Sequence, residues 1–351
     1  MEKISQPLSN KLANRGLFCA LLVLFIHIPM MSVNVGPWLI RAYFSHGIGK
    51  IAVPFFFVSS GYLLARHFDE DMWHRKEVLK RIKTLLVPLV GWCIIWYLTF
   101  GLLFTVAANI VAGRELFANV SMGLTQLLRI FAIYPFSQPY LGVLWFVRTL
   151  FILVLASPFL LRVSTPPWVI LFWVLNGIIF PDYGVKITPV LFTFQEGFIS
   201  IFGAAYFCAG IMLQRQNIDI NVSYRIGLPC LLIGSTLLII RGLPYQDLMS
   251  RVLTWLYIPF LMVGVWWACP STKPLKYLKG MAFPVYVLHM FSLTIISMLV
   301  KACGMNWMTT SCCTGFGYVL KGLVAFVASV VIATIMRETV PTVAKILFGG
   351  R

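Results

Sequence analysis

The chain has 351 residues, of which 60% are hydrophobic and 11% are charged, and its mean hydropathy is +0.88. Soluble globular proteins carry about 25% charged residues, so the composition excludes that class and indicates a multi-pass membrane protein. The formal net charge of +17 therefore bears on orientation in the bilayer, and we do not expect a nucleic-acid partner.

Apolar segments recur along the chain at lengths that suit a bilayer core of about 30 Å, which takes roughly 17–25 residues to cross. We predict ten spanning helices in an all-α transmembrane bundle that forms one domain over residues 1–351. With the N-terminus inside, Lys and Arg concentrate in the inner loops, so both termini are predicted to be cytoplasmic. The ten segments are 16–33, 47–66, 84–108, 141–161, 167–181, 198–213, 225–240, 252–270, 281–300 and 316–337.

The first segment, 16–33, is expected to stay as a membrane anchor and carries His27 near its outer end. An ionisable side chain in a membrane marks a pathway or a reaction site more often than in water, although His27 could instead only bond a neighbouring helix. Pro29 removes the usual donor to the Phe25 carbonyl, which predicts a kink and a polar spot there. Arg15 lies twelve helical steps from His27, about 18 Å, at the inner boundary.

The second segment reads GKIAVPFFFVSSGYLLAR over residues 49–66, and Pro54 is expected to loosen its middle. Small and hydroxylated residues follow toward the inner end, at Ser60, Gly61 and Tyr62. They could line a channel or donate to an oxyanion. Alternatively, they form only a close helix contact and an interfacial anchor.

The cytoplasmic loop after this segment becomes purely basic at Lys80, Arg81 and Lys83, where the chain re-enters the membrane. Such a cluster can hold phosphate groups. The positive-inside rule and anionic lipid head groups also favour basic residues here, so the cluster alone does not identify a ligand.

Three further polar residues interrupt apolar segments. Trp145 suits the outer interface and could line a channel. Arg148 lies deeper in the same segment, so it needs a partner or a watery cavity. Glu196, at the start of the sixth segment, is the candidate partner in a structural ion pair. His289, in FPVYVLHM, is a second histidine inside a predicted span and could assist the first.

The cysteines do not indicate a metal site. Cys303, Cys312 and Cys313 share a predicted outer loop, where two of them could form a disulfide, although spacing alone cannot assign a bridge. The others are single residues in apolar runs, where cysteine packs as a small hydrophobic residue.

The order of these motifs resembles the bacterial integral-membrane acyltransferase family three, which includes O-acyltransferases of surface polysaccharides and lipid-linked sugars. The resemblance is carried by Arg15 and His27 and by the motifs VPFFFVSSGYLLAR, KRIK, LWFVRTLF, YFCAGI and FPVYVLH. It implies a location in the inner membrane and an acyl-CoA donor, expected to be acetyl-CoA. It implies no permanently bound cofactor, and an acceptor hydroxyl on a glycan or lipid-linked sugar.

The resemblance also implies roles for single residues: Arg15 and His27 in catalysis, and Lys80, Arg81 and Lys83 in binding acyl-CoA. In the family, arginine and histidine are usually eleven steps apart and share a helix face, whereas the twelve steps here separate them by about 120°. A bulge, or a non-helical start at Arg15, would restore the register. Lysines also stand where the family's basic motif usually has arginines.

Acyl transfer from a thioester to a hydroxyl needs a base, a donor to the oxyanion and a site that excludes water. A neutral His27 suits the base, and Ser60, Tyr62 or Arg148 could donate to the oxyanion. We expect CoA to stay at the inner face while its pantetheine arm reaches inward. A secondary transporter or flippase for a sugar, lipid or organic anion is the alternative, but no inverted repeat is visible.

Overall fold

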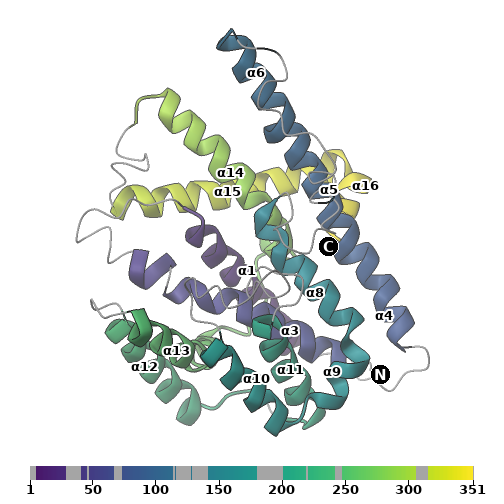
Figure 1. The fold of residues 1–351 in the computed structure, drawn as a ribbon, viewed down its shortest axis with the longest axis vertical. Coiled ribbons are helices and arrows are strands. Elements are labelled where there is room, and N and C mark those ends of the chain that lie inside the picture. The colour runs from purple at the N-terminus through teal and green to yellow at the C-terminus, as the bar shows by residue number, and fades with distance from the viewer. Residues whose placement is uncertain are drawn as a thin grey trace.

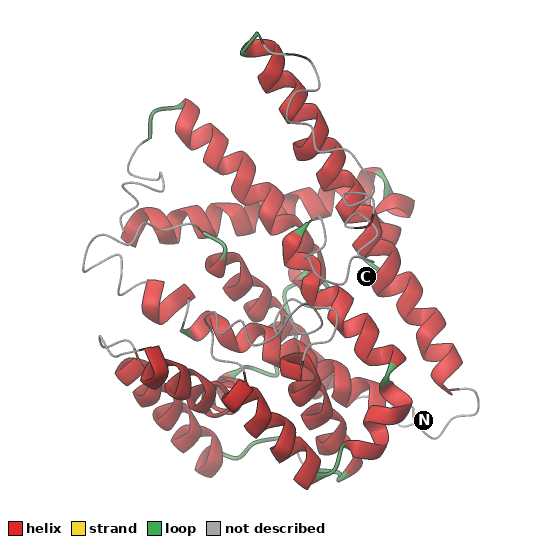
Figure 2. Ribbon diagram, in the orientation of Figure 1, coloured by secondary structure: helices red, strands yellow, loops and turns green. Residues whose placement is uncertain are grey.

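The computed structural model describes residues 5–28, 41–45, 47–66, 73–113, 115, 128, 141–179, 201–218, 220–241, 247–305 and 315–350. All regular secondary structure in these residues is helical, which confirms the predicted all-α class (Figure 2). The elements that position the site are α1 (Gln6–Ile26), η1 (Arg41–Ser45), η2 (Ile48–Ile51), α3 (Ala52–Ala65), α4 (Trp73–Arg81), η3 (Ile82–Leu86), α8 (Trp145–Leu155), α11 (Ile201–Arg215), α14 (Ala282–Ala302) and α15 (Gly315–Thr339). The others are α5 (Val87–Trp96), η4 (Tyr97–Leu103), α6 (Phe104–Val111), η5 (Gly142–Leu144), α9 (Ser157–Val163), α10 (Pro166–Ile179), α12 (Tyr224–Arg241), α13 (Asp247–Ala268), η6 (Lys276–Leu278) and α16 (Pro341–Leu347).

Each of the ten predicted segments overlaps a helix. Among the described residues, six helical runs are long and apolar enough to cross a membrane, or seven if α8 and α9, which meet at 76°, form one broken span. The apolar parts of α10 and α13 are shorter than these runs. The chain is therefore a multi-pass membrane protein by length and composition of its helices, whereas ten spans and cytoplasmic termini stay predictions.

Helix α1 lies at the centre of the molecule and packs against α3, α14 and α15 (Figure 1). It is a continuous α-helix from Gln6 to Ile26, so it begins and ends earlier than the predicted segment 16–33. Pro7 is tolerated in its first turn, because the first N–H groups of a helix have no intrahelical acceptor. Arg15 therefore lies within the helix, in about its third turn, and not at its start.

The second predicted segment, 47–66, contains two helix types in succession, the 3₁₀ turn η2 and the α-helix α3. The π-helical turn η1 lies before this segment. Pro54 is the third residue of α3, so it lies where the 3₁₀ turn gives way to the α-helix. The expected loosening of the middle of this segment is therefore wrong: the irregular backbone precedes Pro54, and α3 is regular after it.

Helices α3 and α11 cross at very close range. A methyl group at Gly61 would lie 2.1 Å from the Phe207 carbonyl oxygen, and one at Gly210 would lie 2.0 Å from the Val58 oxygen. Real Cβ atoms do not come this close, so only glycine permits this approach at either position. Gly61 thus serves the helix contact that was one of its two predicted roles.

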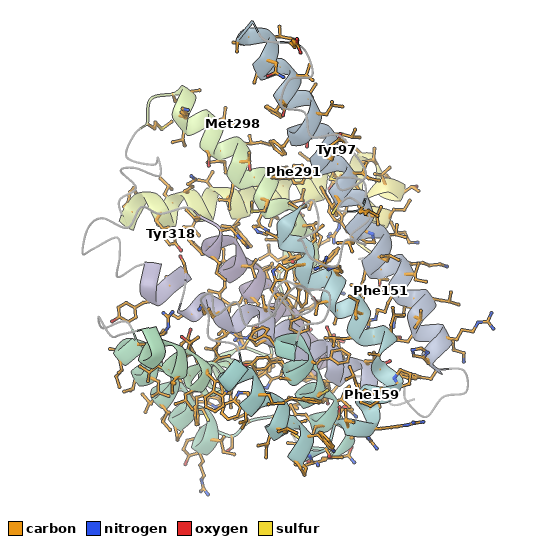
Figure 3. The ribbon with its side chains drawn as sticks, viewed as in Figure 1. Tyr97, Phe151, Phe159, Phe291, Met298 and Tyr318 are labelled. Carbon is orange, nitrogen blue, oxygen red and sulfur yellow. The ribbon has the colours of Figure 1, made fainter. Side chains whose placement is uncertain are left out.

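One long helical run, from Trp73 to Val111, passes along the edge of the molecule through α4, η3, α5, η4 and α6 (Figure 1). It contains two π-helical stretches, η3 and η4. Such stretches change the face that following residues present. The aromatic side chain of Phe291 on α14 packs against Trp96 and Phe100 of this run (Figure 3).

Candidate functional site

A cavity of about 210 Å³ opens where five segments distant in sequence meet. Residues of α1, α3, α8 and α14 line most of it, and the basic end of α4 closes one side. Most of the lining is apolar, and the polar exceptions are two serines, an arginine and a tyrosine. The lining consists of Leu12, Gly16, Phe55, Phe56, Ser59, Ser60, Leu63, Arg81, Leu85, Phe146, Val147, Leu150, Ala282, Phe283 and Tyr286.

Only one of the three predicted basic residues lines the cavity. Arg81 lines it, whereas Lys80 and Lys83 are exposed. The buried carboxylate of Glu77 holds Arg81, with Nε and Oε1 2.6 Å apart, and it also lies 3.5 Å from the Lys80 ammonium. Sequence reasoning missed Glu77, although its spacing of four residues from Arg81 on one helix is the signal that could have found it.

Arg15 lies beside this cavity, fully buried between aromatic rings. Its guanidinium carbon lies 5.2 Å from the centroid of Phe18 and 5.3 Å from that of Phe55, which also lines the cavity. In the part of the chain that the structure describes, none of its three side-chain nitrogens has a hydrogen-bond partner. Because a buried charge without partners is costly, this guanidinium is suited to receive an anionic or strongly polar ligand group.

His27 comes directly after the end of α1 and faces the second intramembrane histidine. The ring centroids of His27 and His289 are 5.2 Å apart and the rings are tilted by 33°. His289 is fully buried, while His27 is partly exposed. The structure thus brings together two residues that the sequence placed in separate segments.

The hydrogen bonds of His289 determine its tautomer. Its Nδ1 lies at hydrogen-bond distance from the Tyr286 carbonyl oxygen, which can only accept, so Nδ1 carries the proton. Nε2 is then a lone-pair acceptor, and among the described residues it has no partner. Tyr286 lines the cavity, so the cavity wall, His289 and His27 form one continuous series of contacts.

The end of α1 is held by hydroxyl groups. The Phe25 carbonyl accepts a hydrogen bond from the Tyr318 hydroxyl at 3.0 Å and one from Ser45 at 3.3 Å. The hydroxyl oxygens of Ser45 on η1 and Tyr318 on α15 lie 2.5 Å apart. The predicted polar spot at Phe25 is therefore present, and it anchors the turn that carries His27; Pro29 lies outside the described residues.

Arg15 and His27 do not lie together. The described α1 has neither a bulge nor a break between Arg15 and Ile26, so the register keeps the separation of about 120° and about 18 Å. Arg15 belongs to the cavity and His27 to the histidine pair. A single reacting atom therefore cannot contact both side chains.

The remaining predicted residues line the cavity, pack between helices or lie outside the described residues. Ser60 lines the cavity, Tyr62 is partly buried beside the α11 contact, and Trp145 begins α8. Arg148 is buried on α8 but is not among the lining residues. Glu196, Cys312 and Cys313 lie outside the described residues. Among the residues that the structure describes, no cluster of metal-ligating side chains occurs.

The comparisons with known proteins agree with these motifs. A protein-family model described as an acyltransferase domain matches residues 16–338, which confirms the resemblance read from the sequence. The matched range includes His27, Arg81 and His289 and begins one residue after Arg15. No curated protein and no solved structure matches the chain.

Proposed function

Since this chain belongs to acyltransferase family 3, with a domain match over residues 16–338, we propose that it moves a short acyl group, expected to be acetyl, from acyl-CoA to a hydroxyl of a cell-surface glycan or lipid-linked sugar. The reaction takes place in the inner membrane. The observation that carries the proposal is the continuous series of contacts from a cavity with a basic side, through Tyr286 and His289, to His27.

The acyl-CoA donor binds at the cavity. CoA carries several phosphate groups, and Arg81 at the cavity with the exposed Lys80 and Lys83 nearby forms a basic surface that suits them. The apolar lining and the serine hydroxyls suit the pantetheine arm, which is slender and carries two amides. Arg15, buried next to the cavity, is assigned to the donor and not to proton transfer, because it lies too far from His27.

His27 acts as the general base. His27 takes the proton of the acceptor O–H while the acceptor oxygen bonds to the thioester carbonyl carbon. The C–S bond then breaks, and the CoA thiolate takes up the proton from the His27 imidazolium as it leaves. The partial exposure of His27, in contrast to the burial of His289, supports its role as the residue that meets the acceptor.

The charge of CoA also supports separate positions for the donor and the base. A polyanionic CoA is costly to carry into the bilayer, whereas its arm can enter, so the thioester is delivered to a base held deep in the bundle. The mostly apolar lining of the cavity is suited to limiting hydrolysis of the thioester.

The test uses membranes that contain the native chain, His27→Ala or His74→Ala at matched protein level, incubated with acetyl-CoA labelled in its acetyl group. His74 is the control because it is another histidine, on α4, whose ring lies 3.3 Å from the Leu155 carbonyl oxygen. A general base contributes roughly 10²–10⁴-fold, so His27→Ala is expected to lose at least about 100-fold of the transfer to glycan or lipid-linked sugar, and His74→Ala to retain it.

Two outcomes would overturn parts of the proposal. Equal transfer by the native chain and His27→Ala would keep the acyltransferase and remove His27 as its base. If the native chain neither binds acyl-CoA nor releases CoA, the proposed donor is wrong.

A further inference from the structure

The two ring nitrogens of His289 differ in their hydrogen bonding. Nδ1–H donates to the Tyr286 carbonyl on the same helix, which fixes the ring in place. Nε2 is buried and has no partner among the described residues. Leaving a buried acceptor unsatisfied is costly, so this atom is expected to meet a donor in the working enzyme.

The donor that the structure brings next to it is the imidazole of His27, at a ring-centroid separation of 5.2 Å. Because His27 follows the last residue of α1, its ring can adjust by side-chain rotation while the helix end stays held at Phe25. Hydrogen bonds between catalytic groups are often long or misaligned before substrate binds and tighten in the complex.

We infer that His289 is a positioning residue for His27: its Nε2 accepts the N–H of one His27 nitrogen and leaves the other nitrogen unprotonated toward the acceptor hydroxyl. When that free nitrogen takes the hydroxyl proton, His27 becomes an imidazolium whose second N–H stays bonded to Nε2. No proton is transferred to His289, and the proton that His27 gained leaves with the CoA thiolate. The inference rests on the proposed function of His27.

Two substitutions of similar size separate this role from simple packing. His289→Gln can place an amide oxygen near the position of Nε2 and so keep an acceptor for His27. His289→Asn is shorter, so its amide reaches only the position of Nδ1 and can still bond the Tyr286 carbonyl. The acceptor for His27 is then lost, while the bond within α14 is kept.

Transfer by these variants is measured with labelled acetyl-CoA at matched protein level. His289→Asn is expected to lower kcat by roughly 10- to 100-fold with an unchanged KM for acetyl-CoA, since a misplaced base costs that much. His289→Gln is expected to recover most of that loss. If the asparagine variant is as active as the glutamine variant, or if both are as active as the native chain, the inference is wrong.

A second readout does not depend on turnover. In protein labelled with ¹⁵N-histidine, nitrogen shifts assigned with the His27→Ala variant report the tautomer of His27. One neutral tautomer is expected in the native chain and in His289→Gln, and a mixture in His289→Asn. The same mixture in all three would overturn the inference. Transfer that is lost in His27→Ala but equal in both His289 variants would refute the inference alone, whereas transfer unaffected in His27→Ala would refute the proposed base.

Discussion

Replacing Gly61 with alanine is expected to destabilise the contact between α3 and α11. The new methyl group would lie 2.1 Å from the Phe207 carbonyl oxygen, whereas ordinary van der Waals contact begins at 3.4 Å. The backbones must therefore separate by about 1 Å, and overpacking of this kind costs about 2 kcal/mol. With an unfolding entropy of about 2.1 cal/mol/K per residue, a chain of 351 residues loses about 1.4 °C per kcal/mol, so the Tm should fall by roughly 3 °C.

The assay is thermal unfolding of the detergent-solubilised protein, and Gly16→Ala is the matched control. A methyl group at Gly16 would have its nearest contact at 3.5 Å from the Ala282 Cβ, so this substitution should leave the Tm unchanged or slightly higher. Transfer per folded molecule should persist in Gly61→Ala, because Gly61 acts here by packing. An unchanged Tm in Gly61→Ala, or a fall equal to that of Gly16→Ala, would refute the reasoning.

Three further substitutions test the cavity and the end of α1. Arg81→Gln should raise the KM for acyl-CoA roughly 10- to 100-fold, through loss of charged hydrogen bonds, while the exposed Lys83→Gln should raise it by no more than about fivefold. Equal effects in titrations of initial rate would show that the cavity position is irrelevant. Ser60→Phe should fill the cavity and weaken binding of labelled acyl-CoA by about tenfold or more. Binding at native strength would mean that the donor lies elsewhere. Tyr318→Phe should cost about 1–2 kcal/mol in thermal unfolding, because the Phe25 carbonyl loses a donor. A Tm equal to that of the native chain would count against this anchor.

Several site residues could be predicted because their chemistry conflicts with their surroundings. A histidine, an arginine or a proline inside an apolar run is visible in the sequence. His27 and Arg15 were singled out on this ground, and Pro29 led to the prediction of a polar spot at the Phe25 carbonyl, which Tyr318 and Ser45 fill.

Other features could not be predicted, because they depend on where helices cross. Nothing local indicates that Arg81, and not Lys80 or Lys83, lines a cavity, because this depends on which face of the helical run meets α1, α3, α8 and α14. The sequence also left open whether Gly61 lines a channel or makes a helix contact, and the position of α11 against it shows the contact.

By itself, the amino-acid sequence determined the membrane class, the all-α architecture, the family and the residues worth testing, because composition and periodicity are local properties of the chain. Only the structure decided that α1 stays regular from Arg15 to Ile26, so that the distance of about 18 Å between Arg15 and His27 is kept, and that His289 lies against His27. The physical reason for the second is that the packing of α14 against α1 joins side chains far apart in sequence, which no local pattern specifies.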